Sequence, residues 1–118
     1  MTSRDVETVD RDLDRLFVYG ALLDAKLRGR LLGRELRSEP ARLPGYYRGR
    51  TQYFFVARRV GASVPGEILS ELLPHDFAVL DRYEAVPRLY TRQRAQVQTA
   101  IEERVSCWIY LPTGWERR

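Results

Sequence analysis

The order of the regular segments constrains the fold of this chain more strongly than any other sequence feature. Runs of β-branched, aromatic and other apolar residues predict strands at residues 16–19, 46–47, 53–56, 64–72, 90–99 and 105–111. Helical patterns follow only the first and the fourth of these strands. Consecutive strands without intervening helices indicate an α+β fold rather than a doubly wound parallel sheet.

Capping residues and glycines mark the limits of these segments. Asp24 is suited to cap the first helix, and Gly33 is suited to end it. Gly61 predicts a turn between the third and fourth strands. Pro74 fits the first turn of the second helix, where its missing N–H group is not needed.

Composition limits the classes of protein that fit. With 118 residues, 44% of them apolar, the chain is expected to form one domain with a core. Cys107 is the only cysteine, which excludes a disulfide scaffold, and with the single histidine, His75, it cannot complete a structural zinc site. No apolar run approaches the roughly 18 residues that span a membrane, and the charged start lacks the apolar stretch of a secretory signal. We therefore expect a cytoplasmic protein with a domain at 15–113 and tails at 1–14 and 114–118.

Arginine accounts for nearly all of the positive charge. Lys26 is the one lysine among 20 basic residues, which face 16 acidic residues and leave a net charge of +4. The arginines are scattered, with dense pairs only at 58–59 and 117–118, whereas a surface that follows phosphates needs a stripe or cluster. A biased amino-acid composition therefore explains the arginines better than nucleic-acid binding, which stays as the weaker alternative.

Residues 19–22 are the first candidate for a binding site. A strand that ends at Gly20 and enters a short loop exposes consecutive backbone N–H groups. Such groups before a helix can hold a carboxylate or an oxyanion. An ordinary turn gives the same pattern, so both interpretations stay open at this point.

Glu84 is the candidate for a catalytic group. Around a helix it lies within about 20° of Phe77, and between Leu80 and Asp81. A helix that buries Phe77 and Leu80 therefore turns Glu84 inward. Burial and the negative end of the helix dipole then both raise the pKa of the carboxyl group toward the range of a general acid–base. The alternative is a glutamate on the surface or one paired with arginine.

Three other residues have weaker cases. Glu67 lies between apolar strand residues and can either face solvent or line the same cavity as Glu84. His75, in the first turn of a helix, is expected to be exposed. Cys107, in the middle of a strand and without a histidine partner, is expected to be a core residue.

Several motifs together resemble the γ-glutamylcyclotransferase-like superfamily, which includes AIG2-like and BtrG-type proteins. The matching segments are Leu16–Leu22 for FVYG(S/T)L, Pro40–Tyr46 for ARLPGY, Val64–Leu69 for V-x-G-x-L, Leu80–Glu84 and Tyr90–Arg92 for LDxxEG…YxR, and Cys107–Tyr110 for AWxY. They follow one another over residues 15–112. The ordered set is more specific than any single motif.

The resemblance implies a fold, a pocket and a reaction. The implied fold is a small mixed β-barrel of about five to six strands flanked by two or more helices. The implied acid–base is Glu84, with Tyr90 at the pocket wall and the γ-glutamyl group held by Tyr19, Gly20, Ala21 and Leu22. The implied reaction, of the transferase or lyase type, cyclises a γ-glutamyl amine or peptide to 5-oxoproline without a metal or organic cofactor. Its implied partner is therefore a small molecule, and no oligomeric state is indicated.

Two positions depart from the family pattern. Ala21 stands where serine or threonine is usual, and Ala85 replaces the glycine after the glutamate. Arg88, close to Glu84 in sequence, can clamp a substrate carboxylate or fill the pocket, and Arg92 is the arginine of YxR. These departures leave open a second function, in which the same pocket binds a small anionic metabolite without catalysis.

Overall fold

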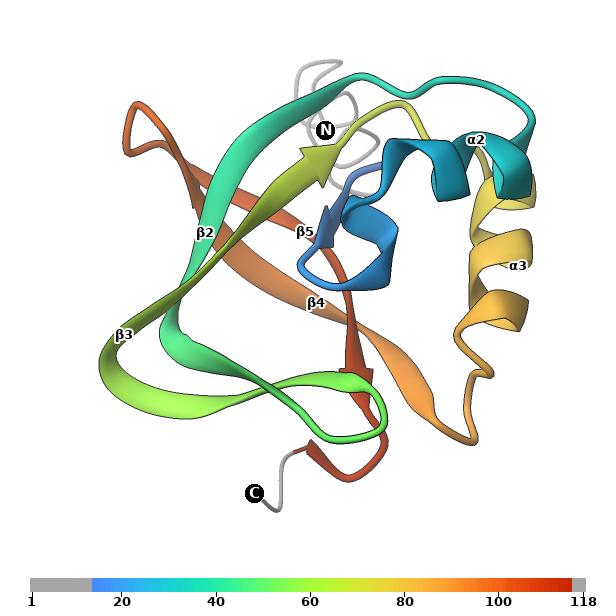
Figure 1. Ribbon diagram of the computed structural model, residues 1–118. Helices are drawn as coiled ribbons and strands as arrows, with labels where there is room; N and C mark the ends of the chain where they lie inside the picture. The colour runs from blue at the N-terminus through green and yellow to red at the C-terminus, as the bar shows by residue number, and fades with distance from the viewer. Residues whose placement is uncertain (1–13, 116–118) are drawn as a thin grey trace, which may run out of the picture.

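Five strands close into a barrel in the computed structural model, which describes residues 14–115. They are β1 (Leu16–Val18), β2 (Ser38–Arg50), β3 (Phe54–Leu69), β4 (Tyr90–Thr99) and β5 (Arg104–Pro112). The order around the barrel is β1–β3–β2–β4–β5 (Figure 1). β1 closes the ring by pairing parallel with β5, and the other neighbours are antiparallel. The predicted α+β class and the small mixed barrel are confirmed.

The helices lie together on one side of the barrel (Figure 1). They are a short 3-10 turn, η1 (Ala21–Leu23), and the helices α2 (Ala25–Leu32) and α3 (Pro74–Tyr83). The carboxylate of Asp24 accepts hydrogen bonds from the N–H groups of Lys26 and Leu27, and Gly33 ends α2 with a φ of 76°. Both capping predictions and the predicted position of Pro74 are confirmed.

The long hairpin of β2 and β3 corrects one prediction, because no turn forms at Gly61. β3 runs unbroken through this residue and ends at Leu69, so two predicted strands are one. Gly45 and Gly61 have φ values of 84° and 82°, and the pairing register shifts between Pro44 and Tyr46. Left-handed glycines at a β-bulge let both strands bend together. The ribbon therefore curves around the barrel where a turn was expected.

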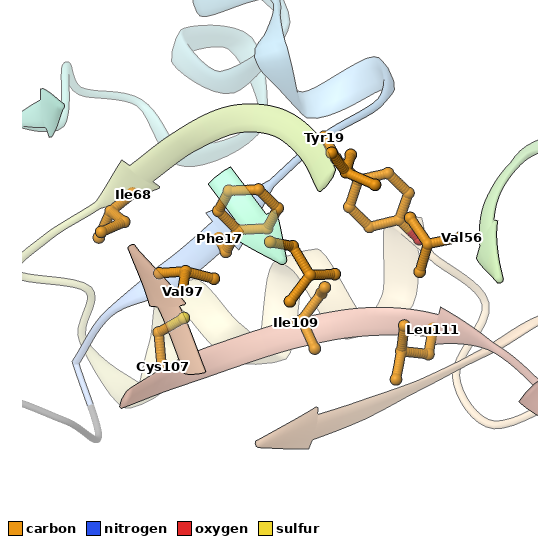
Figure 2. Close-up of a cluster of buried hydrophobic side chains, with 10 residues drawn as sticks. Phe17, Tyr19, Val56, Ile68, Val97, Cys107, Ile109 and Leu111 are labelled. Atoms are coloured by element: carbon orange, nitrogen blue, oxygen red, sulfur yellow. The ribbon is translucent and has the colours of Figure 1, made fainter. Parts of the chain in front are cut away.

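Two groups of buried side chains form the core. The group inside the barrel includes Phe17, Ile68, Val97, Cys107 and Ile109 (Figure 2). The group between the barrel and the helices includes Leu16, Val18, Leu69, Phe77 and Leu80. Because Phe17 faces one group while Leu16 and Val18 face the other, β1 is buried on both faces, which explains its unbroken apolar run. Cys107 is a core residue, as predicted.

The predicted tails fall largely outside the described part of the chain, since residues 1–13 and 116–118 are not part of it. Among the helices of residues 14–115, none is long and apolar enough to cross a membrane. In the same range, no three His, Cys, Asp or Glu side chains gather as ligands for a metal ion.

Candidate active site

A cavity of about 340 Å³ lies at the end of β1. Its walls come from β1 and the loop after it, the tip of the β2–β3 hairpin, the end of α3, and β4 and β5. The lining residues are Phe17, Val18, Tyr19, Gly20, Ala21, Leu22, Arg50, Gln52, Tyr53, Phe54, Tyr83, Glu84, Leu89, Tyr90 and Tyr110. The fold thus brings together the loop at 19–22, Glu84 and Tyr90, which the family resemblance predicts in one site.

Glu84 lies where α3 ends, and it lines the cavity. Its N–H group donates a hydrogen bond to the carbonyl of Leu80 (2.9 Å), so the last helical turn fixes its backbone. Phe77 and Leu80 are buried on the same helix. Burial raises the pKa of the Glu84 carboxyl from its ordinary 4.5 to about 7, because the carboxylate loses hydration there. The group can therefore take up or release a proton near neutral pH.

Three buried tyrosines line the cavity near this carboxyl group. Tyr19 donates a hydrogen bond to the backbone carbonyl of Tyr110 (2.5 Å), and Tyr90 donates to a carbonyl at the start of β3 (2.5 Å). Tyr110 donates to Oδ1 of Asp81 (2.6 Å). Burial raises the pKa of all three phenols, that of Tyr90 to about 12, and the Glu84 carboxylate adds to each shift. The phenols therefore stay uncharged near neutral pH.

The loop after β1 enters the cavity as a 3-10 turn. The N–H group of Leu23 closes this turn on the carbonyl of Gly20 (3.0 Å), and Arg48 donates to the carbonyl of Tyr19 (2.9 Å). A Cβ atom on Gly20 would lie 3.1 Å from Phe54, so glycine lets the loop approach the hairpin closely. The first N–H groups of a helical turn have no partner within it. The residues at the start of this turn, Gly20, Ala21 and Leu22, line the cavity.

Glu67, Arg88 and Arg92 do not line this cavity. Glu67 instead lies 3.8 Å from Nη1 of Arg28. Arg88 is exposed in the segment after α3. Arg92 donates a hydrogen bond to Asp81 (2.9 Å) and lines a second cavity of about 530 Å³. Glu67 and Arg92 therefore pair with oppositely charged side chains outside this cavity, and Arg88 faces solvent.

Arg50 and Gln52 line the cavity although the sequence does not single them out. Both lie at the tip of the β2–β3 hairpin, which reaches the cavity because its strands are longer than predicted. The guanidinium of Arg50 lies 4.8 Å from the centre of the Phe54 ring, so it brings a positive charge to the cavity. No local sequence pattern indicates this position, since it depends on the length and curvature of the hairpin.

Comparison with known families identifies one match. The family model described as "Gamma-glutamyl cyclotransferase, AIG2-like" matches residues 16–118. This range contains every residue of the loop, the cavity and the helix that carries Glu84. No curated protein sequence matches the chain significantly.

Solved structures share the fold at low sequence identity. A solution structure from Arabidopsis thaliana has a TM-score of 0.76 at 23% identity, and the match covers 84% of this chain and 68% of that one. A structure called gamma-glutamyl cyclotransferase has a TM-score of 0.75 at 18% identity, with coverages of 85% and 66%. An AIG2-like protein from Mus musculus has a TM-score of 0.63 at 21% identity, with coverages of 87% and 82%. The chain thus spans about two thirds of the length of the first two.

Proposed function

This chain belongs to the AIG2-like gamma-glutamyl cyclotransferase family, and we propose that it cleaves a γ-glutamyl amine or peptide by cyclisation to 5-oxoproline. The observation that carries the proposal is the position of Glu84, whose pKa is about 7 and which shares a cavity with the loop at 19–22. A carboxyl group with this pKa suits the transfer of protons near neutral pH.

The proposed substrate carries its own nucleophile. The α-amine of the γ-glutamyl group attacks the side-chain amide carbonyl, and the new C–N bond closes the ring of 5-oxoproline. The C–N bond to the leaving amine then breaks. Because nucleophile and carbonyl belong to one molecule, a cavity that holds the substrate folded supplies a high effective molarity.

Glu84 performs the proton transfers in this proposal. As a carboxylate it accepts a proton from the α-ammonium group, which frees the nucleophile. As a carboxylic acid it returns that proton to the nitrogen of the leaving amine. The attacking nitrogen loses a second proton as the lactam forms; the regenerated carboxylate accepts it, and the released amine carries it away as its ammonium form. The raised pKa values of Tyr19, Tyr90 and Tyr110 keep their phenols protonated, so they do not compete with Glu84 as bases.

The loop holds the γ-glutamyl half in this proposal. The N–H groups of Gly20, Ala21 and Leu22 bind the substrate carboxylate or the oxyanion that forms at the carbonyl. Ala21 lacks the hydroxyl group that is usual in the family signature, so this role rests on the backbone. Arg50 adds a positive charge to the same cavity, which suits an anionic ligand.

Release of 5-oxoproline from a panel of γ-glutamyl amino acids, peptides and amines tests the function. We expect turnover by the wild-type protein, and a loss of about 10²- to 10⁴-fold in kcat for Glu84→Gln with an unchanged circular dichroism spectrum. Glu35→Gln is the matched control, because Glu35 is exposed and outside the cavity, and it should keep full activity.

Two results would argue against the proposal. Full activity of Glu84→Gln would remove Glu84 from the mechanism. A panel member that raises the Tm of the wild-type protein without being turned over would favour the second function, a binder of small anionic metabolites.

A further inference from the structure

Arg28 is a buried cation that the proposed reaction does not use. Among the arginines of residues 14–115 it alone is buried, with 7% of its surface exposed, whereas Arg30 on the same helix is exposed. Burial of a guanidinium is unfavourable unless its charge and its N–H groups are satisfied. The contacts of Arg28 therefore indicate what its burial achieves.

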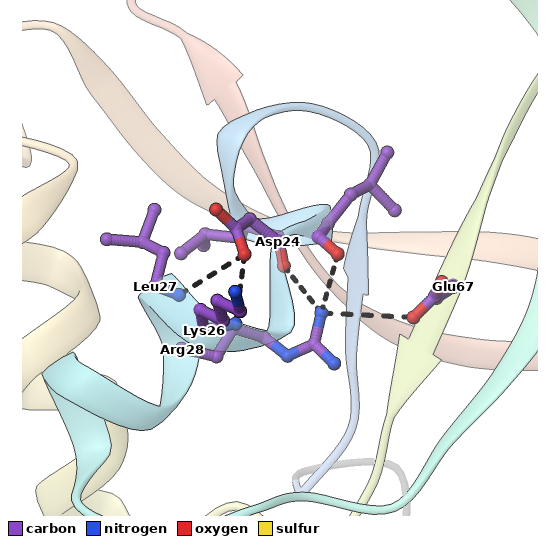
Figure 3. Close-up of polar contacts among 7 residues, drawn as sticks. Asp24, Lys26, Leu27, Arg28 and Glu67 are labelled. Atoms are coloured by element: carbon purple, nitrogen blue, oxygen red, sulfur yellow. Dashed lines mark hydrogen bonds and ion pairs between the residues drawn. The ribbon is translucent and has the colours of Figure 1, made fainter.

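Arg28 reaches from α2 to the loop that lines the cavity (Figure 3). Its Nη1 atom donates hydrogen bonds to the carbonyls of Leu22 (2.8 Å) and Leu23 (3.1 Å). Both carbonyls are at the end of the turn η1, where a helical turn leaves such groups without internal partners. Arg28 thus satisfies the last carbonyls of the turn that carries the candidate binding loop.

Glu67 holds the same guanidinium from the barrel side. Its Oε1 atom lies 3.8 Å from Nη1 of Arg28 (Figure 3). Glu67 is paired across β3 and β1 with Val18, two residues before Gly20. Neither Arg28 nor Glu67 lines the cavity. The pair therefore connects the loop to the barrel from outside the cavity.

We propose that Arg28, oriented by Glu67, is a positioning residue that holds the loop Gly20–Leu23 in the shape that binds the γ-glutamyl half of the substrate. This inference rests on the proposed function. Because the peptide unit is planar, fixing the carbonyl of Leu22 also fixes the N–H group of Leu23, which closes the turn on the carbonyl of Gly20 (3.0 Å). Arg28 acts through the loop and does not touch the substrate.

Steady-state kinetics of Arg28→Met, with Arg30→Met as the matched control, test the proposal. Arg28→Met replaces the apolar stem of the side chain with another unbranched apolar chain, but removes the guanidinium and with it both hydrogen bonds. We expect its KM to rise at least about tenfold while kcat changes less than about threefold, since the loop binds substrate and Glu84 moves the protons. Arg28→Lys, which keeps a charge but loses the planar fork, should be intermediate. Arg30→Met should match the wild type.

Amide hydrogen exchange gives a readout that does not depend on turnover. The N–H group of Leu23 should exchange faster in Arg28→Met, and to a smaller extent in Glu67→Gln, than in the wild type or Arg30→Met. Should Arg28→Met fail to fold, Arg28→Lys and Glu67→Gln carry the same comparison. A wild-type KM in the folded Arg28 variants overturns the proposal, whatever their Tm. If the wild-type protein releases no 5-oxoproline, the proposed function alone is refuted, and hydrogen exchange still tests the positioning role. Unchanged exchange at Leu23 in the Arg28 variants then overturns that role.

Discussion

Burial places the pKa of Glu84 at about 7, so the activity of the protein should follow the ionisation of this one group. The proposed reaction begins when the carboxylate accepts a proton from the substrate ammonium, and protonated Glu84 cannot do this. We therefore expect kcat/KM to rise with pH through an apparent pKa of about 7. Initial rates of 5-oxoproline release at constant ionic strength, between about pH 5 and pH 9, measure it.

The substrate titrates as well, so its contribution needs a control. The pKa of the α-ammonium group can be measured on the free substrate, and kcat/KM can be corrected for it. A corrected profile that stays flat through neutral pH would mean that Glu84 is not the base.

The position of Glu84 could be predicted from the sequence because the argument needs only the local helical period. The helical period does not predict the surroundings of this carboxyl group. The phenols of Tyr19, Tyr90 and Tyr110 come from separate elements, and only the closed barrel brings them to the carboxyl group. Arg92 shows the opposite case: it lies near the site in sequence, but Asp81 accepts its hydrogen bond (2.9 Å) outside the main cavity.

At the scale of the element, the start of α3 depends on one buried carboxylate. Asp76 accepts hydrogen bonds from both terminal nitrogens of Arg34 (2.6 and 2.7 Å) and from the N–H group of Leu73 (2.7 Å). Arg34 is partly exposed, so solvent screens its charge and moderates the loss. We therefore expect Asp76→Asn to lower the free energy of unfolding by about 1–3 kcal/mol. Urea unfolding at neutral pH measures this loss of stability. The substitution should also loosen α3, the helix that ends at Glu84.

The effect should depend on pH with a defined sign. The hydrogen bonds from Arg34 lower the pKa of Asp76 below its ordinary value. The stabilisation is therefore present above the ordinary range of aspartate and is lost as the pH falls through the lowered pKa. Wild type and Asp76→Asn should converge in acid. The control is Glu102→Gln, which breaks an exposed pair with Arg42 (2.9 Å) and should change stability by less than about 1 kcal/mol. Equal losses for both variants would contradict the prediction.

Two glycines offer opposite outcomes for the same substitution. A Cβ atom on Gly66 would lie 2.3 Å from the carbonyl oxygen of Val18, so Gly66→Ala should push β3 away from β1 and cost about 1–3 kcal/mol. A Cβ atom on Gly29, inside α2, meets nothing within 4 Å, and Gly29→Ala should stabilise the protein by about 0.5–1 kcal/mol. Thermal unfolding of both variants compares them. A neutral Gly66→Ala would show that β1 and β3 tolerate separation.

Element boundaries could be predicted where a single residue decides them. Asp24 and Gly33 act within one turn of the chain, and their signals suffice. Gly61 has the same kind of local signal but a different outcome, because Gly45 on the partner strand bends with it. Whether a left-handed glycine ends a strand or curves it depends on this partner. The extent of β2 and β3, and with it the position of Arg50, therefore could not be predicted from the local sequence.

At the scale of the whole molecule, the two core groups share their strands. β1 contributes Phe17 to the group inside the barrel and Leu16 and Val18 to the group beneath the helices. β5 likewise contributes Ile109 to the first group and Tyr110 to the second. Since β1 also closes the barrel, neither group can lose this strand without disturbing the other. The cavity lies at the end of β1, so its shape depends on both groups.

This sharing predicts a single unfolding transition. The chain has two tryptophans, and each packs against a different group: Trp115 against the group inside the barrel and Trp108 against the group beneath the helices. Trp108→Phe leaves Trp115 as the fluorescent probe, and Trp115→Phe leaves Trp108. Each variant has its own stability, so the test compares its fluorescence midpoint in urea with its own far-UV circular dichroism midpoint. Because the groups share β1 and β5, both pairs of midpoints should coincide. A Trp108 signal that changes at lower urea than the circular dichroism of the same variant would mean that the helices detach first. The loop and Glu84 would then open without unfolding of the barrel.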